Sequence, residues 1–276
     1  MVLSDLWPVL LTGLGAAVAL QMVTFLYALR VGRFSVVDVA WGLGFALIAV
    51  AGWLVSLGSP ADSLRRALIV VLTVVWGCRL AWHIGRRQRG ETQDDPRYVE
   101  MMSNSSGAWA ALRKVFLLQA VVGWFVAFPV QFAMVDAGGP GPLLFVGVVV
   151  WGVGFFFEAV GDRQLQNFRA DPGNKGQVMD RGLWRYTRHP NYFGDACVWW
   201  GLFLIAADAG WSWLTVLSPI LMTWFLAAKT GKPLMERSLA KSRPGYAEYA
   251  ERTSGSFLGR PGGSGGAFAA LPQSLA

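Results

Sequence analysis

Residues 141–160 read GPLLFVGVVVWGVGFFFEAV, an apolar run in which Glu158 is the only charged residue. About 20 such residues in a helix cross the hydrocarbon core of a bilayer. Comparable apolar stretches recur along the chain at 6–29, 36–57, 67–84, 115–135, 192–207 and 211–228. We therefore expect an all-α fold, a polytopic integral membrane helix bundle of about seven transmembrane helices.

The composition argues against a soluble protein. Hydrophobic residues make up 54% of the chain and charged residues 15%, whereas about a quarter of an average soluble domain is charged. A soluble bundle would lack the polar sequence needed to cover its surface. Cys78 and Cys197 lie in or beside apolar segments, so we expect both to pack as small hydrophobic residues, and their spacing predicts no metal site.

Basic residues predict the orientation in the membrane. They lie in short loops between apolar spans, so the net charge of +7 favours membrane orientation over nucleic-acid binding. With seven spans, one side receives Arg30, Arg33, 86–89, 113–114, 163–188 and the segment from Lys229 onward, while the other receives only Arg65 and Arg66. We expect the N-terminus outside and the C-terminus in the cytoplasm, as in a bacterial inner membrane protein. Asp5 stands where a signal peptide would carry positive charge, so we expect the first span to be retained.

The polar loops suggest where function resides. We expect one transmembrane domain over residues 1–253 and a flexible Gly/Ser-rich tail over 254–276. In this topology the loops 85–114, 161–191 and 229–253 share the cytoplasmic side and form a basic, hydrogen-bonding cup. Topology alone also explains such a cup, since arginines retain helices and bind anionic lipid headgroups.

Asp38 and His83 are the candidate catalytic residues because both are ionisable side chains within apolar spans. A charge at the membrane centre costs about 2.5–3.5 kcal/mol on insertion scales, so it needs a partner or a wet cavity. Structural roles remain open for both residues. Asp38 is equally explained by an ion pair with Arg79, and His83 by snorkelling or helix pairing.

Residues 185–195 read RYTRHPNYFGD and carry the densest polar chemistry of the chain. Retention at the membrane needs charge alone, but this stretch combines guanidinium, imidazole, amide, phenol and carboxylate groups. Arginines pair with phosphates, an amide orients a ring or a ribose, and aromatic rings stack on a base. The stretch therefore favours a ligand that carries phosphates and a nucleoside.

The segment GLWRYTRHPNYFGDACVWWG (182–201) resembles the steroid 5-alpha reductase superfamily, in particular bacterial members without an assigned substrate. The resemblance runs from about Ser35 to Arg252 and includes SVVDVAWGLGF, WGCRLAWHIGRRQRG, DPRY, DRQLQNFR, NKG and RPGYAEYAERTS. It implies a membrane oxidoreductase that uses NADPH to reduce a carbon–carbon double bond conjugated to a carbonyl. The substrate would be a hydrophobic small molecule that enters from the bilayer.

The resemblance also implies a set of cofactor-binding residues. Hydride would pass to the β-carbon while a protein donor hydrogen-bonds the carbonyl and stabilises the enolate. The animal enzymes use a Glu on the second helix and a Tyr on the third for that donor, whereas here span two offers Asp38 and span three offers no tyrosine. The implied cofactor residues are Asp162, Arg169, Tyr186, Arg188, His189, Asn191, Tyr192, Asp195, Tyr249 and Arg252.

Two other functions fit the same residues. Isoprenylcysteine and phospholipid methyltransferases also resemble the Arg-His-Pro segment, and they bind S-adenosylmethionine with a later Glu/Tyr segment. ERSLAKSRPGYAEY fits that pattern, with Glu236 as the cofactor contact. The third function is a non-enzymatic scaffold whose cup binds lipid headgroups.

Overall fold

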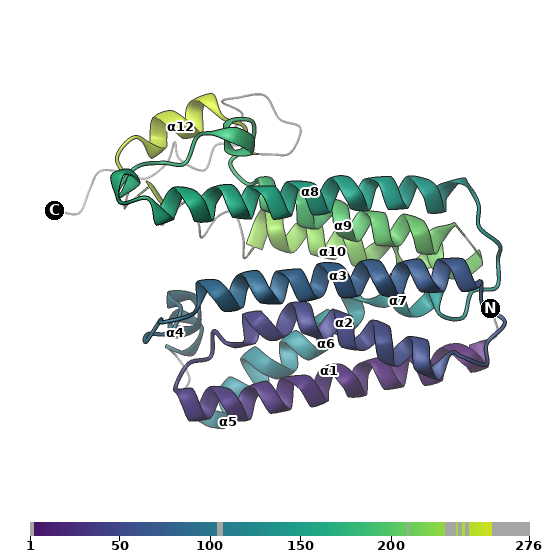
Figure 1. Ribbon diagram of the computed structural model, residues 1–276. Coiled ribbons are helices and arrows are strands. Elements are labelled where there is room, and N and C mark those ends of the chain that lie inside the picture. Colours follow the sequence, from purple (N-terminus) through teal and green to yellow (C-terminus); the bar gives the residue numbers. More distant parts are fainter. Residues whose placement is uncertain are drawn as a thin grey trace. The chain divides into compact units, whose positions relative to one another are not determined.

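The computed structural model describes residues 3–103, 107–208, 210–229, 236, 239–240 and 243–255 (Figure 1). Long helices dominate this part of the chain, and its one β-type contact is an isolated bridge between Thr187 and Ser254. The long helices are α1 (Leu3–Val31), α2 (Val37–Val55), α3 (Ser63–Arg87), α8 (Pro142–Ala170) and α9 (Pro190–Ala207). Most of the predicted tail, 254–276, lies outside the described residues.

Shorter helices complete the fold. In the first half they are α4 (Pro96–Met102), α5 (Ala108–Ala111), the π-helix η1 (Leu112–Leu117), α6 (Leu118–Val126) and α7 (Phe128–Ala133). In the second half they are η2 (Pro172–Asn174), η3 (Gly182–Arg185), η4 (Gly210–Val216), α10 (Leu217–Trp224), η5 (Phe225–Lys229) and α12 (Tyr246–Arg252).

The all-α polytopic fold is confirmed. Six helical segments in the described chain are long and apolar enough to cross a membrane: Ser4–Val31, Val37–Val55, Ser63–Arg87, Ala108–Val126, Pro142–Ala170 and Gly210–Ala227. The remaining predicted span, 192–207, is helical as part of α9. The chain is therefore an integral membrane protein, while seven crossings and the orientation of the termini stay predictions.

The predicted span 115–135 is not one continuous helix. It passes from η1 through α6, breaks at Ala127, and restarts as α7 with Pro129 in the first turn. Proline has no N–H for the helical ladder and clashes with the preceding turn, so a helix ends before it and a new one begins. Pro129 therefore begins a new helix and does not merely kink one.

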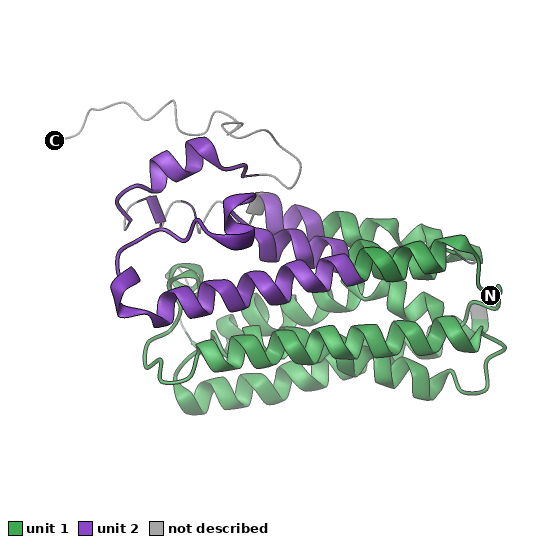
Figure 2. Ribbon diagram, turned by 45° about the horizontal axis from the view of Figure 1, so that its top comes forward, with its two compact units in different colours: residues 1–151, 199–221 green, residues 152–198, 222–276 purple. Residues whose placement is uncertain are grey.

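The helices group into two compact units, residues 1–151 with 199–221 and residues 152–198 with 222–276 (Figure 2). We call them unit 1 and unit 2. Helices α8 and α9 each contribute residues to both units. The single domain expected over residues 1–253 stays a prediction.

Unit 1 is held together by close helix contacts and an aromatic core. A Cβ on Gly42 of α2 or on Gly77 of α3 would overlap the other residue's carbonyl oxygen, so only glycine permits this approach. Trp76 and Trp199 are fully buried, and their ring centroids lie 5.4 Å apart. Phe45 on α2 packs against both rings.

Helices α1 and α6 run antiparallel within unit 1. The indole Nε1 of Trp124 on α6 donates a hydrogen bond of 2.9 Å to the Leu10 carbonyl on α1. Towards the other end of α1, the ring of Phe25 lies 5.2 Å from that of Phe116, which precedes α6. The order of these two contacts shows that the two segments run in opposite directions.

Unit 2 places the RHPNYFGD segment against the second half of α8. Gly154 on α8 and Gly194 on α9 leave no room for a Cβ on either residue. Two turns further along α8, the Gly161 carbonyl accepts a hydrogen bond of 3.0 Å from Trp184 Nε1. These contacts fix the start of α9 and the preceding loop on one side of α8.

A buried arginine stabilises unit 1 at the start of α3. Arg65 is fully buried, and its guanidinium donates to the carbonyls of Ile205, Gly138 and Gly139 while lying 3.5 Å from the Asp208 carboxylate. One side chain therefore satisfies three carbonyls and one buried charge. Within the described part of the chain, the guanidinium of the neighbouring Arg66 makes one hydrogen bond, to the Ser56 carbonyl.

We expect Arg65→Met to lower the free energy of unfolding by about 3–5 kcal/mol, because it leaves three buried carbonyls without their donor and removes the cation beside the Asp208 carboxylate. Arg66→Met is the matched control and should cost about 1 kcal/mol, the net value of one hydrogen bond. Denaturant unfolding in detergent micelles measures both. Equal losses for the two variants would contradict the role assigned to Arg65.

Candidate functional site

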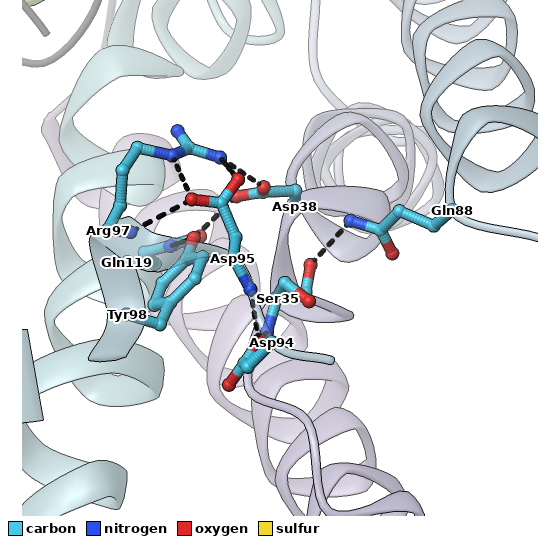
Figure 3. Close-up of polar contacts among 8 residues, drawn as sticks. All are labelled: Ser35, Asp38, Gln88, Asp94, Asp95, Arg97, Tyr98 and Gln119. Carbon is cyan, nitrogen blue, oxygen red and sulfur yellow. Dashed lines mark hydrogen bonds and ion pairs between the residues drawn. The ribbon is translucent and has the colours of Figure 1, made fainter. Parts of the chain in front are cut away.

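A half-buried cluster around Asp38 forms the polar site of unit 1 (Figure 3). The Tyr98 phenol donates a hydrogen bond of 2.5 Å to Asp38 Oδ1, and Arg97 Nη2 lies 2.9 Å from Asp38 Oδ2. The same guanidinium makes two hydrogen bonds to Asp95, of 2.9 and 3.0 Å. Asp38 is thus held by a phenol and a guanidinium that are adjacent in sequence.

Local sequence explains how Arg97 and Tyr98 reach Asp38. Asp95 is the N-cap of α4 and accepts a hydrogen bond from the Arg97 backbone N–H, while Pro96 occupies the first helical position. Asp94 accepts hydrogen bonds from the backbone N–H groups of Phe34 and Ser35, just before α2. The short helix is therefore tied to the start of α2, where Asp38 lies (Figure 3).

The electrostatics keep the Tyr98 phenol and the Arg97 guanidinium each in one protonation state. Burial raises the pKa of Tyr98, and the negative charge of Asp38 raises it further. Burial alone would lower the pKa of Arg97, but the carboxylates of Asp95 and Asp38 outweigh it and hold that pKa above the usual value. At neutral pH the phenol is therefore a neutral hydrogen-bond donor and the guanidinium is charged.

The cluster continues towards α6 through an amide. Gln119 Nε2 donates a hydrogen bond of 3.3 Å to the Tyr98 oxygen. Gln119 also lines a narrow cleft between α1, α2 and α6. A hydrogen-bonded chain thus leads from Asp38 through Tyr98 to the wall of this cleft.

The structure places the two catalytic candidates, Asp38 and His83, in different surroundings. Asp38 pairs with Arg97, because the helix start at Asp95–Pro96 brings that guanidinium to α2. The ion pair of Asp38 with Arg79 stays a prediction. His83 lies on α3 and is half-buried, and its catalytic role stays a prediction.

Unit 2 gathers the histidine segment around Glu236. His189 Nε2 lies 2.9 Å from Glu236 Oε1, and Arg188 Nε lies 3.4 Å from the same oxygen. All three residues are buried. The His189 ring stacks on Tyr192 at 5.2 Å between centroids, with 6° between the ring planes.

Four other predicted residues occupy the interior of unit 2. Asp162 is buried on α8 and accepts a hydrogen bond of 3.3 Å from Asn191 Nδ2. Asp195 is half-buried one turn further along α9. Tyr249 on α12 is buried and donates a hydrogen bond to the Trp184 carbonyl, and burial raises the pKa of its phenol above the usual value.

The remaining three predicted residues lie on the surface of unit 2. Arg252 on α12 makes an ion pair of 2.6 Å with Asp180. Tyr186 follows η3 with 74% of its surface exposed, and Arg169 is exposed in the last turn of α8. The cofactor role of all ten predicted residues stays a prediction.

An open pocket of about 520 Å³ adjoins this surface within unit 2. Arg252 is one of its walls, and Arg181 and Arg185 are two others. The full lining is Asp180, Arg181, Gly182, Arg185, Arg252 and Thr253. Gly182 adopts a φ of +60°, a conformation that favours glycine, and this turn places the two arginines on either side of it.

Sequence reasoning missed the residues that complete both sites. Tyr98 and Arg97 belong to the DPRY segment, where Asp followed by Pro is a helix-start signal that places the next two residues on the first turn. The pocket arginines Arg181 and Arg185 flank GLW, and no spacing in the sequence indicates that they share a pocket with Arg252. Only the fold brings α12 to them.

The fold and these two polar sites define an integral membrane protein of the all-α class with polar chemistry on helices and loops. The chain belongs to the family described as protein of unknown function DUF1295, whose model matches residues 24–253. Searches of curated proteins and of solved structures returned no match.

The cap of α4 is expected to depend on pH. Burial by itself raises the pKa of Asp95, but the hydrogen bonds from the Arg97 side chain and backbone outweigh it, so the pKa lies below its usual 3.8. The carboxylate therefore stabilises α4 above that pH, and the stabilisation is lost as the pH falls through the lowered value.

We expect amide hydrogen exchange in α4, corrected for the intrinsic rate, to accelerate below about pH 4 because the cap becomes protonated. Asp95→Asn should remove this acid dependence, whereas Glu100→Gln, on an exposed residue of the same helix, should retain it. An acid transition that survives Asp95→Asn would assign the pH dependence to another group.

Proposed function

We propose that this protein is a membrane-embedded, NADPH-dependent reductase of a carbon–carbon double bond conjugated to a carbonyl in a lipidic substrate. The observation that carries the proposal is the arginine-lined pocket of unit 2. The resemblance of residues 35–252 to the steroid 5-alpha reductase superfamily supports the same reaction. On this proposal the protein lies in the bacterial inner membrane with the cofactor site towards the cytoplasm.

The pocket fits a polyanionic ligand. Its lining carries three arginines and one aspartate, and that aspartate is paired with Arg252. Neither Arg181 nor Arg185 has a carboxylate partner among the residues that the structure describes. Guanidinium groups bind phosphate oxygens in a bidentate manner, and about 520 Å³ lies within the usual range of ligand pockets. A nucleotide with several phosphates would match the positive charge and the volume of this pocket.

The interior of unit 2 offers a further donor to a ligand. The Tyr246 phenol is buried, and its oxygen has no hydrogen-bond partner in the described part of the chain. Burial, followed by the charge of Glu236, raises the pKa of Tyr246 to about 12. The phenol therefore stays protonated and can donate a hydrogen bond to a cofactor oxygen. Such a bond would remove the cost of leaving the buried Tyr246 O–H unpaired.

Unit 1 carries the candidate hydrogen-bond donor to the substrate carbonyl, the Tyr98 phenol. NADPH, when bound, supplies the hydride that adds to the β-carbon of the double bond. The Tyr98 O–H turns from Asp38 to the carbonyl oxygen of the substrate and stabilises the negative charge that develops there. Asp38 stays paired with Arg97 during this change. A proton taken from water then adds to the α-carbon and completes the saturated ketone.

A methyltransferase is the second candidate because Glu236 contacts His189 and Arg188. This contact brings together the two segments that the methyltransferase resemblance assigns to S-adenosylmethionine. That cofactor carries a positive sulfonium and a single carboxylate. Three arginines in one pocket favour a ligand with more negative charge. We therefore place the reductase first.

Thermal unfolding of the purified protein with each cofactor tests this order. We expect NADPH at about 100 times its dissociation constant to stabilise the folded protein by about 2.7 kcal/mol, with no shift from S-adenosylmethionine. Arg181→Gln with Arg185→Gln should weaken NADPH binding, because both substitutions remove phosphate contacts. Arg163→Gln, an exposed arginine on α8, is the control and should leave the affinity unchanged.

The other results of this experiment each favour a different function or a different cofactor site. A shift with S-adenosylmethionine alone would establish the methyltransferase. If neither cofactor stabilises the protein, the arginines serve membrane lipids and the scaffold explanation holds. NADPH binding that survives the double substitution would move the cofactor away from this pocket.

The acid assignment predicts a separate loss of activity. With lipid-soluble enones as substrates and NADPH oxidation as the readout, Tyr98→Phe should lower kcat by about 10²–10³, the cost of removing one hydrogen-bond donor to a developing oxyanion. The ring is retained, so packing is unchanged and NADPH should still stabilise the variant. Tyr27→Phe removes an exposed phenol from α1 and should have no effect. Full activity in Tyr98→Phe would exclude the phenol as the donor.

A further inference from the structure

An exposed tryptophan near the end of α3 contacts two arginines. Trp82 has 60% of its surface exposed, and the guanidinium carbons of Arg86 and Arg89 lie 5.9 and 5.6 Å from the centroid of its ring. Residues four and seven positions apart lie on one face of a helix, so the three side chains share one surface. We call these three residues the Trp82 patch.

The end of α3 keeps the two arginines beside each other. Gln88 is the C-cap of α3, and its side chain donates a hydrogen bond of 2.8 Å to the Ser35 carbonyl. The Arg89 backbone N–H donates a hydrogen bond of 3.3 Å to the Arg86 carbonyl. Gly90, with a φ of +84°, then turns the chain. Arg89 therefore stays next to Arg86 although the helix has already ended.

The positive charge of the patch is not neutralised within the protein. Arg86 and Arg89 are exposed, and in the described part of the chain neither forms an ion pair with a carboxylate. A cation–π contact orients a guanidinium but leaves its N–H groups able to donate. The C-terminal end of a helix also attracts cations, but that attraction needs no tryptophan. The patch therefore presents two oriented cations to an anionic partner.

The depth of the patch indicates that this partner is a lipid headgroup. The apolar sequence of α3 runs from Ala67 to Ile84, which is about 27 Å of helix and matches a hydrocarbon core of about 30 Å. Trp82 lies in the last turn of this stretch, and tryptophan is enriched at the boundary between hydrocarbon and headgroups. Arg86 and Arg89 follow directly, at the level of the lipid phosphates.

We propose that the Trp82 patch binds the headgroup of an anionic phospholipid, with the phosphate held by Arg86 and Arg89. Guanidinium groups bind phosphate oxygens in a bidentate manner. Phosphatidylcholine also carries a phosphate, but the two arginines repel its ammonium group. The patch is therefore selective for lipids of net negative charge.

This lipid site goes beyond the proposed reductase activity and does not depend on it. The patch shares no residue with the arginine-lined pocket of unit 2 or with the cluster around Asp38. It also differs from retention by charge alone, because the tryptophan ring fixes where the two guanidinium groups lie. One defined position on α3 should therefore matter more than other basic residues at the same end of unit 1.

Lipid binding to the delipidated protein in neutral detergent micelles tests this proposal. The dependence of Tm on lipid concentration gives apparent dissociation constants for phosphatidylglycerol and for phosphatidylcholine with identical acyl chains. The wild type should bind phosphatidylglycerol about five- to thirtyfold more tightly, the attraction of one or two arginines for an anionic headgroup. Glycerol 3-phosphate and inorganic phosphate at equal ionic strength should leave the Tm unchanged, because neither has acyl chains to hold it at the patch.

Two pairs of arginines separate the patch from general basic charge. Arg86→Gln with Arg89→Gln should remove most of the preference for phosphatidylglycerol. Arg30→Gln with Arg33→Gln removes the same charge from the end of α1, which adjoins the end of α3 through the bond between Gln88 and Ser35. This matched control should keep the preference.

Two tryptophans test the role of the ring. Trp82→Leu retains both charges but removes the ring that orients them, so the preference should fall about two- to fivefold. Trp109→Leu changes another tryptophan of unit 1, which is 66% exposed, and should leave the preference unchanged. The Tm of each variant without lipid shows whether its fold is retained.

Several results would overturn the proposal. Equal losses from the two arginine pairs would assign lipid binding to general basic charge, and an unchanged preference in Trp82→Leu would remove the ring from the site. Equal binding of the two lipids by the wild type would exclude selectivity. Stabilisation by inorganic phosphate or glycerol 3-phosphate would make the patch a site for free anions. Because no cofactor is present, a failed NADPH experiment would leave the lipid site in place.

Discussion

The hydrocarbon interior of a bilayer offers no hydrogen bonds, and this constraint shapes the whole chain. Every backbone N–H and C=O within the membrane must be paired inside the protein, which is why the spanning segments are helices. The same constraint makes each polar side chain in a span costly unless it finds a partner. Arg65 satisfies three carbonyls and a carboxylate at one place, and Asp38 is satisfied by a phenol and a guanidinium at another.

The sequence predicts the fold class well because hydropathy reports the same constraint directly. Runs such as 141–160 are long and apolar enough to identify a span without any tertiary information. The break at Ala127 was harder to predict, since Pro129 is compatible both with a kinked helix and with two separate helices. Side-chain packing around the proline decides between a kinked helix and two helices. The hydrophobic periodicity of the sequence carries no information about this packing.

The polar sites were only partly predictable for a similar reason. Asp38 stands out as a carboxylate inside an apolar run, but its partners come from a loop some sixty residues away. Arg79 drew attention because it is a basic residue inside an apolar span, whereas Arg97 lies in a polar loop where basic residues are common. The histidine segment was identifiable because its residue types are unusual in one short stretch. Arg181 and Arg185 looked like ordinary basic loop residues until α12 brought Arg252 into the same pocket.

The contact between Gly42 and Gly77 has a mechanical consequence. Two backbones that touch directly leave no side chains between them to repack, so α2 and α3 cannot slide or separate by small steps. Any widening of the space beside Trp41 must then come from the opposite wall. That wall includes α6, which follows the π-helical turn of η1 and precedes the interruption at Ala127. We therefore expect α2 and α3 to move together, and any local adjustment to fall on the segment from η1 to α7.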